Sequence, residues 1–564
     1  MERILLVEPN YKNKYPPIGL MKISTYYKYK GDFVQFQKGL LPVAEVATFD
    51  KVFITTLFTF DFDMCIETIR YYVAIVGIDN VFVGGIAATI MPERFLNEVK
   101  GLHLLKGQLT SASVLGYNDE TNIDILELDY DILWDVEYDY PAADSYFIYT
   151  SRGCPRKCSF CAVKTLEPTF YECQNVREQI ERVDARFGIK KNLLIMDNNA
   201  LFAPHLPETI KTIISLGFGA DNNIIKKCNE IPFMLRSLFE REKVGKNYMY
   251  LLQRIKQVLL HVTISRVSKA DALQLQPFLD LIKNARDDEL LSYISAHQDF
   301  LNDFFERYNY HKIKRYVDFN QGLDARFFTK EKAQLLSTIA LKPCRIAFDN
   351  IDTKSDYFKA LDMATSSGIH YFSNYLLYNY QDAPIDLWNR LFLNIEYCEK
   401  HPEIKALFSF PMKYASIEHT DRSYVGDLWN KKFLKSLNII LNVTGGVVAK
   451  EKDFFLHAFG HNTNEFLEIL SMPDDFIRYR DYFEKAGLIV RWEEEYKKLS
   501  MTEKAELIEL LSSAEKEIDI IEQPHSKSLD EILLFYSVKK SKVEKNRVYY
   551  LRLCNSHILN NELF

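Results

Sequence analysis

The sequence predicts an α/β protein with a doubly wound parallel sheet, then a partial barrel of six strand–helix units, and then a mainly helical C-terminal region. Three observations lead to this prediction. Short apolar runs alternate with helix-like segments over the first hundred residues, the alternation resumes near residue 145, and helix formers dominate beyond residue 421. The chain has 564 residues, of which 47% are hydrophobic and 26% are charged, so it can bury several cores.

Residues 1–118 are predicted to form the doubly wound, Rossmann-like domain. Its strands are expected at residues 3–8, 33–34, 51–57 and 80–84, and its main helices at residues 18–30 and 63–75. Gly84 and Gly85 end the last of these strands. The carboxyl ends of parallel strands are where such sheets usually bind ligands.

Residues 119–144 differ from the rest of the chain in composition. There is no Lys or Arg between residues 107 and 151, whereas ten Asp and Glu fall between Asp119 and Asp144. We expect an extended acidic linker that lies across the surface. A solvated connector without a further task is the favoured interpretation.

Residues 145–420 are predicted to form the partial barrel, with its active face at the carboxyl ends of the strands. The expected strands are residues 145–149, 192–196, 316–320, 345–348, 369–377 and 405–410, and helices join them. An insertion, about residues 220–311, is too long for a structureless loop, and its apolar spacing predicts packed helices. Residues 231–270 carry eight Lys and Arg against two acidic residues. They form either a docking surface for an anionic partner or, as we favour, a solvated helix face.

Residues 421–564 are predicted to form a mainly helical domain, with helices at residues 501–511 and 530–538 and a short strand at residues 548–553. This region says little about chemistry.

Charge and cysteine content exclude several classes of protein. The 70 Lys and Arg against 77 Asp and Glu give a formal net charge of -7, so there is no global basic field to hold nucleic acid. Nine Cys in 564 residues are too few for a disulfide scaffold. No secretion signal and no apolar run of membrane-spanning length is expected. We therefore predict a cytoplasmic protein without a membrane partner.

The most informative stretch is residues 151–161, SRGCPRKCSFC, directly after the first barrel strand. Cys154, Cys158 and Cys161 lie close enough in sequence for one loop to wrap a metal centre. Three thiolates leave one iron of a four-iron cluster without a protein ligand, which a reactive centre needs. Arg152 and its basic neighbours are expected to offset the thiolate charge. The alternative is a zinc site that also uses Cys173, although zinc sites favour paired Cys-x2-Cys spacings.

This loop resembles that of the radical S-adenosylmethionine (radical SAM) superfamily, whose hallmark is Cys-x3-Cys-x-aromatic-Cys after the first strand of a partial barrel. Phe160 supplies the aromatic residue. The sequence RGCPRKCSFCAV is typical of the branch with an N-terminal cobalamin-binding-like domain, and YPPIGL at residues 15–20 is consistent with that branch. The resemblance covers residues 1–420, apart from the insertion.

The resemblance implies a 4Fe-4S cluster on Cys154, Cys158 and Cys161. The cluster binds S-adenosylmethionine and cleaves it reductively to a 5'-deoxyadenosyl radical, with electrons from a donor of the flavodoxin or ferredoxin type. It further implies that polar residues at the ends of the second and third barrel strands bind the cofactor. These residues are Asp197, Asn199, Asn320, Gln321, Asp324 and Arg326. A structural ion pair between Asp324 and Arg326 is equally compatible with the sequence. No residue is assigned a catalytic role.

Cobalamin is disfavoured, because the lower-ligand motif Asp-x-His-x-x-Gly of such domains is absent. His103, the only His in the first 150 residues, is expected to pack in or near a strand. The function predicted is thus a radical SAM enzyme with an unidentified substrate, which the basic insertion could dock. The alternatives are a cobalamin-dependent radical SAM methyltransferase and a non-catalytic, zinc-stabilised binding protein.

Overall fold

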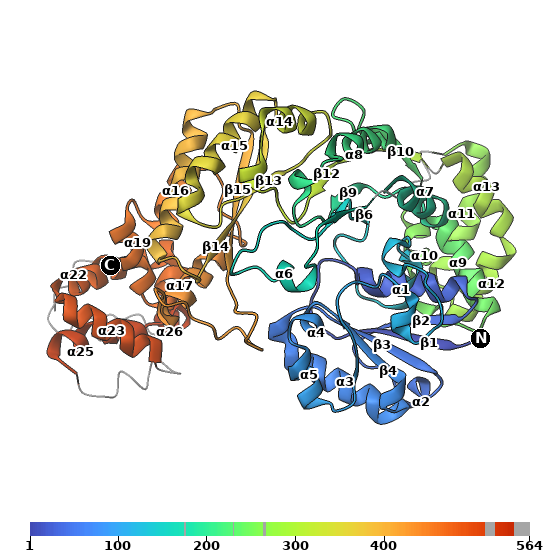
Figure 1. The fold of residues 1–564 in the computed structure, drawn as a ribbon, viewed down its shortest axis with the longest axis horizontal. Helices are drawn as coiled ribbons and strands as arrows, with labels where there is room; N and C mark the ends of the chain where they lie inside the picture. The colour runs from blue at the N-terminus through green and yellow to red at the C-terminus, as the bar shows by residue number, and fades with distance from the viewer. Residues whose placement is uncertain (174–175, 229, 263–266, 309, 514–524, 546–564) are drawn as a thin grey trace. The chain divides into compact units, whose positions relative to one another are not determined.

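The computed structural model describes residues 1–564 apart from residues 174–175, 229, 263–266, 309, 514–524 and 546–564 (Figure 1). The chain forms two compact units, residues 1–344 with 416–422 and residues 345–415 with 423–564. Both units combine helices with parallel strands, so the predicted α/β class is confirmed. The division at residue 344 falls inside the segment predicted as a barrel, and the predicted domain limits stay predictions.

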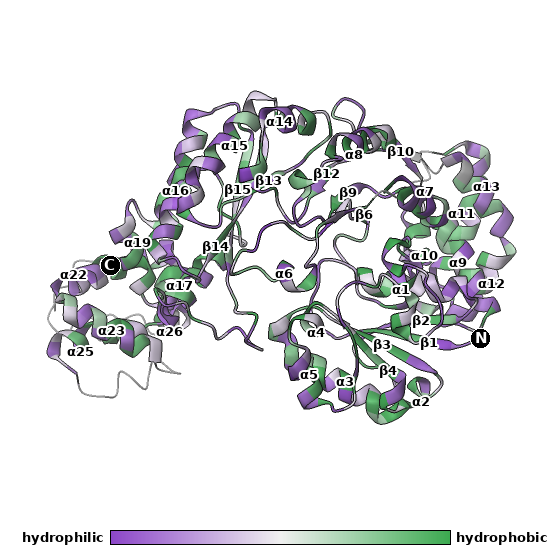
Figure 2. Ribbon diagram, in the orientation of Figure 1, coloured by the Kyte–Doolittle hydropathy of each residue, from purple (hydrophilic) through white to green (hydrophobic). Residues whose placement is uncertain are grey.

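The first unit begins with a five-stranded sheet in the order β2-β1-β3-β4-β5, in which all neighbouring strands are parallel. Doubly wound sheets use this order. The strands are β1 (Arg3–Glu8), β2 (Phe33–Lys38), β3 (Lys51–Thr56), β4 (Val81–Gly85) and β5 (His103–Leu105). The connecting helices are α1 (Ile18–Tyr29), α2 (Val43–Val46), α3 (Phe62–Val76), α4 (Ile86–Ile90) and α5 (Pro92–Glu98). The central strands are hydrophobic along their length (Figure 2), as strands buried on both faces must be.

The acidic segment, residues 119–144, is folded into the first unit. Its short 3-10 helices are η4 (Ile123–Ile125) and η5 (Tyr130–Asp135). The prediction of a solvated surface linker is wrong, because Glu127 and Asp129 are buried. Glu127 pairs with Arg186 at 3.0 Å, and Asp129 pairs with Lys28 at 2.7 Å. The missing cations are supplied by distant parts of the chain.

The insertion is a helical subdomain, as predicted. Its helices are α9 (Ile231–Lys243), α10 (Met249–Leu260), α11 (Lys269–Lys283), α12 (Asp287–Ala296) and α13 (Gln298–Tyr308). Leu235, Ile255 and Phe278 are among the residues of its own apolar core. The strands β10 (Ile224–Cys228) and β11 (Tyr310–Lys314) pair antiparallel and join its two ends, a ribbon that the sequence did not predict.

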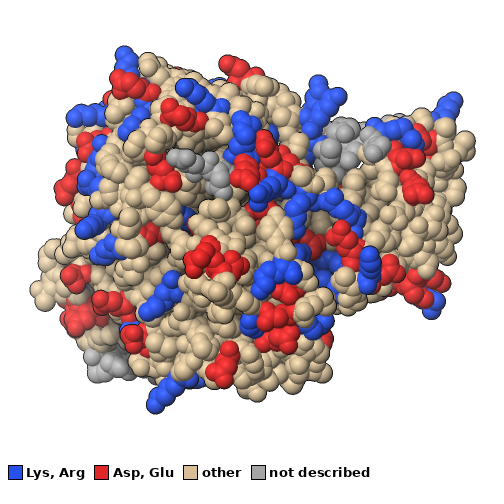
Figure 3. All heavy atoms as spheres, turned by 45° about the vertical axis from the view of Figure 1, so that its right-hand side comes forward, with Lys and Arg blue, Asp and Glu red and all other residues tan. Residues whose placement is uncertain are grey.

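Basic residues of the insertion bind the acidic segment. Arg241 Nη1 lies 2.5 Å from Asp135 Oδ1, Arg241 Nη2 lies 3.1 Å from Asp131 Oδ1, and Lys246 Nζ lies 2.9 Å from Asp135 Oδ2. Neither a docking surface nor a solvated face describes these buried cations. Elsewhere Lys and Arg are interspersed with Asp and Glu on the face that Figure 3 presents.

The six strands predicted for the barrel all form, in two parallel sheets. In the first unit the order is β12-β9-β6, and in the second it is β13-β14-β15. The strands are β6 (Ser145–Ile148), β9 (Asn192–Ile195), β12 (Val317–Phe319), β13 (Cys344–Ala347), β14 (Tyr371–Tyr378) and β15 (Ala406–Lys413). The helices that follow them are α7 (Val176–Phe187), α8 (Leu206–Ile213), α14 (Lys330–Ser337), α15 (Lys354–Ser366) and α16 (Pro384–Lys400). The closure of these strands into one barrel stays a prediction.

The second unit continues as a helical domain. Its helices are α17 (Lys431–Val443), α18 (Lys452–Phe459), α19 (Thr463–Ser471), α20 (Asp474–Arg478), α21 (Arg480–Lys485), α22 (Leu488–Lys498), α23 (Met501–Ser513), α25 (Lys527–Leu533) and α26 (Lys540–Lys545). The two predicted helices of this region are confirmed by α23 and α25, and the strand predicted at residues 548–553 lies outside the described residues. None of the described helices is both long and apolar enough to cross a membrane.

Candidate functional site

The cysteine loop, residues 151–161, begins at the end of β6 and is fixed by its glycine. The short strand β7 (Ser151–Arg152) pairs with β8 (Tyr171–Glu172) and leads directly into Gly153. Gly153 has φ +75°, and a Cβ there would lie 2.3 Å from the carbonyl oxygen of Thr169. Only glycine fits this turn. The three thiols that follow are half-buried.

Two of the three thiols meet polar residues from other strand ends. The Cys154 Sγ accepts hydrogen bonds from the backbone N–H of Arg156 at 3.4 Å and from Asn199 Nδ2 at 3.5 Å. Arg326 lies near Cys158: Asp324 and, to a smaller extent, Cys158 raise the pKa of the Arg326 guanidinium. Cys161 closes the loop locally through a backbone hydrogen bond to the carbonyl oxygen of Cys158 at 3.1 Å.

Asn199, Asp324 and Arg326 form a connected group beside the thiols. Arg326 binds Asp324 through two hydrogen bonds of 2.6 and 2.8 Å, and Asn199 Nδ2 lies 3.4 Å from Asp324 Oδ2. The structural ion pair weighed from the sequence therefore exists, and it lies beside the cysteine loop. Asn199 is 2% exposed and its Oδ1 has no hydrogen-bond partner among the described residues. A buried acceptor without a partner is costly, and a donor on a ligand would satisfy it.

Asn320 and Gln321 have different surroundings. Asn320 is buried, and its Oδ1 accepts a hydrogen bond of 2.8 Å from the hydroxyl of Tyr15. Tyr15 belongs to the loop that follows β1, so the N-terminal sheet contributes to this edge of the site. Gln321 is exposed, and no described contact joins it to the thiols.

Asp197 faces the strand that leads into the loop. Its carboxylate accepts hydrogen bonds from the Thr150 N–H at 2.7 Å, from the Thr150 hydroxyl, and from the Ser151 hydroxyl at 2.7 Å. Burial raises the pKa of Asp197 to about 6, although these hydrogen bonds oppose the shift. The observed role of Asp197 is to hold residues 150–151 on the end of β9, and its predicted contact with a cofactor stays a prediction.

The arrangement of the thiols does not suit a single zinc ion. Among the described residues, one set of three Cys, His, Asp or Glu ligand atoms lies within 4.8 Å of one another, and it is His457, Asp481 and Glu484 in the second unit. A tetrahedral zinc–thiolate site, with Zn–S bonds of about 2.3 Å, requires sulfurs about 3.8 Å apart. The three loop thiols do not form such a set. Burial raises the pKa of Cys173, the fourth candidate ligand, to about 11.

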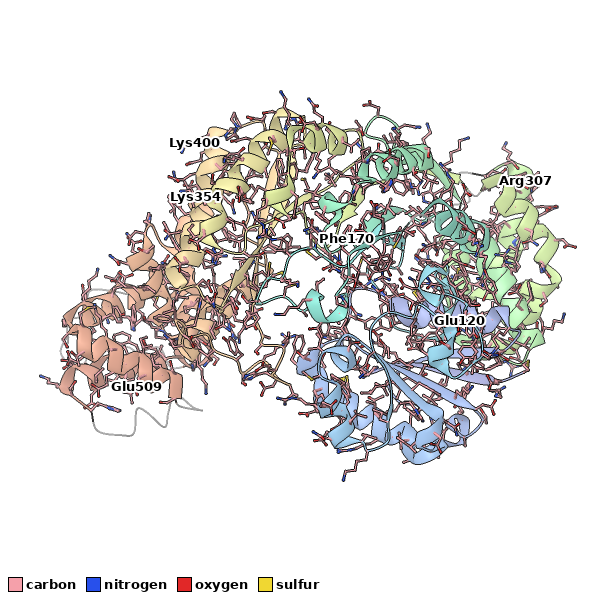
Figure 4. The ribbon with its side chains drawn as sticks, viewed as in Figure 1. Glu120, Phe170, Arg307, Lys354, Lys400 and Glu509 are labelled. Atoms are coloured by element: carbon pink, nitrogen blue, oxygen red, sulfur yellow. The ribbon has the colours of Figure 1, made fainter. Side chains whose placement is uncertain are left out.

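Two features of the site were not predicted from the sequence. Arg152 pairs with Asp124 and Glu167, so its charge is not directed at the thiols as expected. Phe170, labelled in Figure 4, lies edge-on to Phe202 with ring centroids 4.9 Å apart, and Phe202 lies 5.4 Å from Phe327. These aromatic rings follow the cysteine loop, β9 and β12 in the chain. No local sequence pattern marks them.

The residues at the carboxyl edge of the N-terminal sheet bind one another. Thr56 Oγ1 donates to the Gly84 carbonyl oxygen at 2.9 Å and accepts from the Ala88 N–H at 3.0 Å. Helix α4, which follows β4, packs against α6 (Val163–Leu166), the helix just after the cysteine loop. His103 lies at the amino end of β5 and stacks on Phe82, but its side chain is 46% exposed rather than packed as the sequence predicted.

Comparison of the chain with protein-family models and with curated proteins finds no match. The assignment of function therefore depends on the residues and contacts described above.

Proposed function

We propose that this chain is a radical SAM enzyme that acts on an unidentified substrate. In this proposal Cys154, Cys158 and Cys161 hold a 4Fe-4S cluster. Bound there, the cluster supplies the electron that cleaves S-adenosylmethionine to a 5'-deoxyadenosyl radical. The observation that carries the proposal is the contact of Cys154 with Asn199, which in turn hydrogen-bonds Asp324, the partner of Arg326; these residues follow other parallel strands.

The donor set supports this group. Three thiols on one loop leave one iron of a four-iron cluster open to a ligand. The unpartnered Asn199 Oδ1 and the adjacent Asp324 carboxylate are suited to the amine of S-adenosylmethionine, because both accept hydrogen bonds. Arg326, rather than Arg152, is the cation near Cys158, and it is also paired with Asp324. The rings of Phe170, Phe202 and Phe327 would exclude water beside the loop.

The order of the strands also supports the proposal. Six parallel-sheet strands follow one another in the chain from β6 to β15, with helices between them, as a partial (β/α)6 barrel requires. Asn199 and Asn320 follow β9 and β12, and active sites of such barrels lie at the carboxyl ends of the strands.

The two alternatives receive less support. A cobalamin-dependent methyltransferase would bind its cofactor at the carboxyl edge of the N-terminal sheet, where Thr56 and Gly84 instead hydrogen-bond each other. A zinc-stabilised binding protein needs thiols closer together than these. The insertion remains a candidate for substrate docking only through its exposed residues, because Arg241 and Lys246 bind the acidic segment. An electron donor of the flavodoxin or ferredoxin type remains part of the proposal.

The test is made on anaerobically purified and reconstituted protein. Iron, sulfide and zinc are measured per chain, and the conversion of S-adenosylmethionine to 5'-deoxyadenosine by dithionite is followed. We expect about four iron and four sulfide with cleavage in the wild type and in the control Cys173→Ala, and loss of both in Cys158→Ala. Zinc without sulfide, no cleavage, and zinc loss in Cys173→Ala would refute the proposal.

A further inference from the structure

A buried series of alternating cationic and anionic side chains connects helix α1 to the cysteine loop. Lys22 Nζ lies 3.1 Å from Asp124 Oδ1, Arg152 Nη2 lies 2.6 Å from Asp124 Oδ2, and Arg152 Nη1 lies 2.8 Å from Glu167 Oε1. The four side chains are only 6 to 14% exposed. The series contains two cations and two carboxylates, so its net charge is zero and each charge is paired.

Glu167 is the last side chain of this series, and it also hydrogen-bonds residues next to the candidate site. Its Oε2 accepts a hydrogen bond of 2.6 Å from the Gly153 N–H and another of 2.7 Å from Asn198 Nδ2. Gly153 immediately precedes Cys154, and Asn198 immediately precedes Asn199, which itself contacts Cys154. One carboxylate thus binds the backbone of the residue before Cys154 and the side chain of the residue before Asn199.

Arg152 connects Glu167 to the rest of the unit. Its guanidinium stacks on the ring of Tyr149, 3.2 Å from the ring centroid, while it binds Glu167 and Asp124. Asp124 comes from the acidic segment and Lys22 from α1. Residues from three separate parts of the first unit therefore determine where the cysteine loop starts. A planar guanidinium with two carboxylate partners has little freedom to reorient.

We propose that Glu167 is a positioning residue for the metal centre, and that it holds Cys154 and Asn199 in register through Gly153, Asn198 and Arg152. This inference rests on the proposed function for its purpose, but the placement of the loop is measurable without any cluster. Loss of the carboxylate leaves the Gly153 N–H and Asn198 Nδ2 without their partner and Arg152 with Asp124 alone, and the loop then opens more often.

The first experiment uses the full-length protein without metal. Alkylation by N-ethylmaleimide is followed by peptide mass spectrometry at Cys154, Cys158 and Cys161, with the fully buried Cys65 as an internal report on global unfolding. In Glu167→Ala we expect Cys154 to react about tenfold faster, since loss of one buried charged hydrogen-bond acceptor has about that effect. Cys65 stays protected. The matched control is Glu178→Ala, whose side chain on α7 is 57% exposed and pairs with Arg182.

A second variant keeps the test decisive if Glu167→Ala unfolds. Glu167→Gln keeps one acceptor oxygen for Gly153 or Asn198 and loses the charge that Arg152 binds, so its Cys154 rate should fall between wild type and Glu167→Ala. A wild-type rate at Cys154 in either variant, with Cys65 protected, would overturn the proposal.

The loaded protein gives a readout that a merely structural residue would not change. Glu167→Gln removes a negative charge beside an anionic cluster, so its reduction potential should rise relative to wild type and to Glu178→Ala. An unchanged potential would contradict the proposal. Failure of the wild type to take up iron and sulfide refutes the proposed function, whereas normal uptake with unchanged Cys154 reactivity in Glu167→Ala refutes the positioning role alone.

Discussion

The acidic segment and the cysteine loop belong to the same compact unit, and they differ in how their buried polar groups are satisfied. Asp131 lies between Lys28 and Arg241, at 2.8 and 3.1 Å, and these cations lower the pKa of its carboxyl well below the usual range although burial opposes this. Asp197 receives only neutral hydroxyl and N–H donors, and burial raises its pKa to about 6. Beside it, the Asn199 Oδ1 has no described partner.

This difference distinguishes an unusual composition that the fold itself explains, in the acidic segment, from one that it leaves unexplained, in the cysteine loop. The run of carboxylates in residues 119–144 is explained by cations of the same chain, so nothing further needs to bind there. The cysteine loop keeps half-buried thiols and an unpartnered buried acceptor, which a ligand would complete. Variants of the two regions should therefore affect different measurements.

The largest effect is expected for Arg241→Ala. This change removes the guanidinium that binds both Asp131 and Asp135, and leaves each of these buried carboxylates with one cation, Lys28 or Lys246. The free energy of opening of α9, measured by native-state hydrogen exchange, should fall by about 3–5 kcal/mol. Iron and sulfide uptake by the folded protein should not change, because the cysteine loop does not contact Arg241.

The matched control is Arg254→Ala in the same insertion. Arg254 pairs with Asp139 at 2.7 Å, but the two side chains are 37% and 76% exposed, so the expected loss is at most about 1 kcal/mol. Equal losses for the two variants would remove the distinction between a buried and a solvated contact of the insertion.

The next effect concerns Asp197, on the other side of the comparison. Because burial raises its pKa to about 6, the protonated carboxyl stabilises the folded state fully below pH 4, and this contribution is lost as the pH rises through 6. Asp197→Asn cannot titrate. Between pH 4 and 7, the wild type should lose on the order of 3 kcal/mol of stability relative to this variant. Hydrogen exchange of β6 and β9 measures it, with the exposed Asp221→Asn as control. Parallel pH profiles of wild type and Asp197→Asn would show that Asp197 ionises normally.

The secondary structure was predictable because its signals are local. The apolar runs of β1, β3, β4 and β9 are each complete within a few residues, and the structure has these strands within two residues of the predicted limits. The resemblance, together with their positions after parallel strands, implied that Asn199 and Asp324 lie near the cysteine loop, and Asn199 does contact both Cys154 and Asp324.

Pairings between distant charges were not predictable. Arg241 and Asp131 are 110 positions apart, and Tyr15 and Asn320 are 305 apart, so no spacing rule connects them. Taken alone, the composition of the acidic segment and that of the basic insertion each predict a solvated surface. A charge run of one sign can instead be one half of a buried interface when a run of the other sign occurs in the same chain.

The smallest effect is expected for Lys246→Met, within the same interface as Arg241. Burial lowers the pKa of Lys246 to about 8, so its ammonium is costly to keep charged in the folded protein, and Asp135 retains Arg241 at 2.5 Å when Lys246 is removed. At pH 7 the opening free energy of α9 should change by less than about 1 kcal/mol, in the stabilising direction.

This effect of Lys246→Met should depend on pH. The free-energy cost of keeping the buried Lys246 ammonium charged is full below pH 8 and disappears toward pH 10.5, so the advantage of the variant should fade over that interval. Hydrogen exchange of α9 at pH 7 and pH 10 measures this, with Arg241→Ala as the reference for a pair that the interface cannot lose. A loss of stability as large as that of Arg241→Ala would mean that Lys28, Arg241 and Lys246 are all needed to neutralise Asp131 and Asp135.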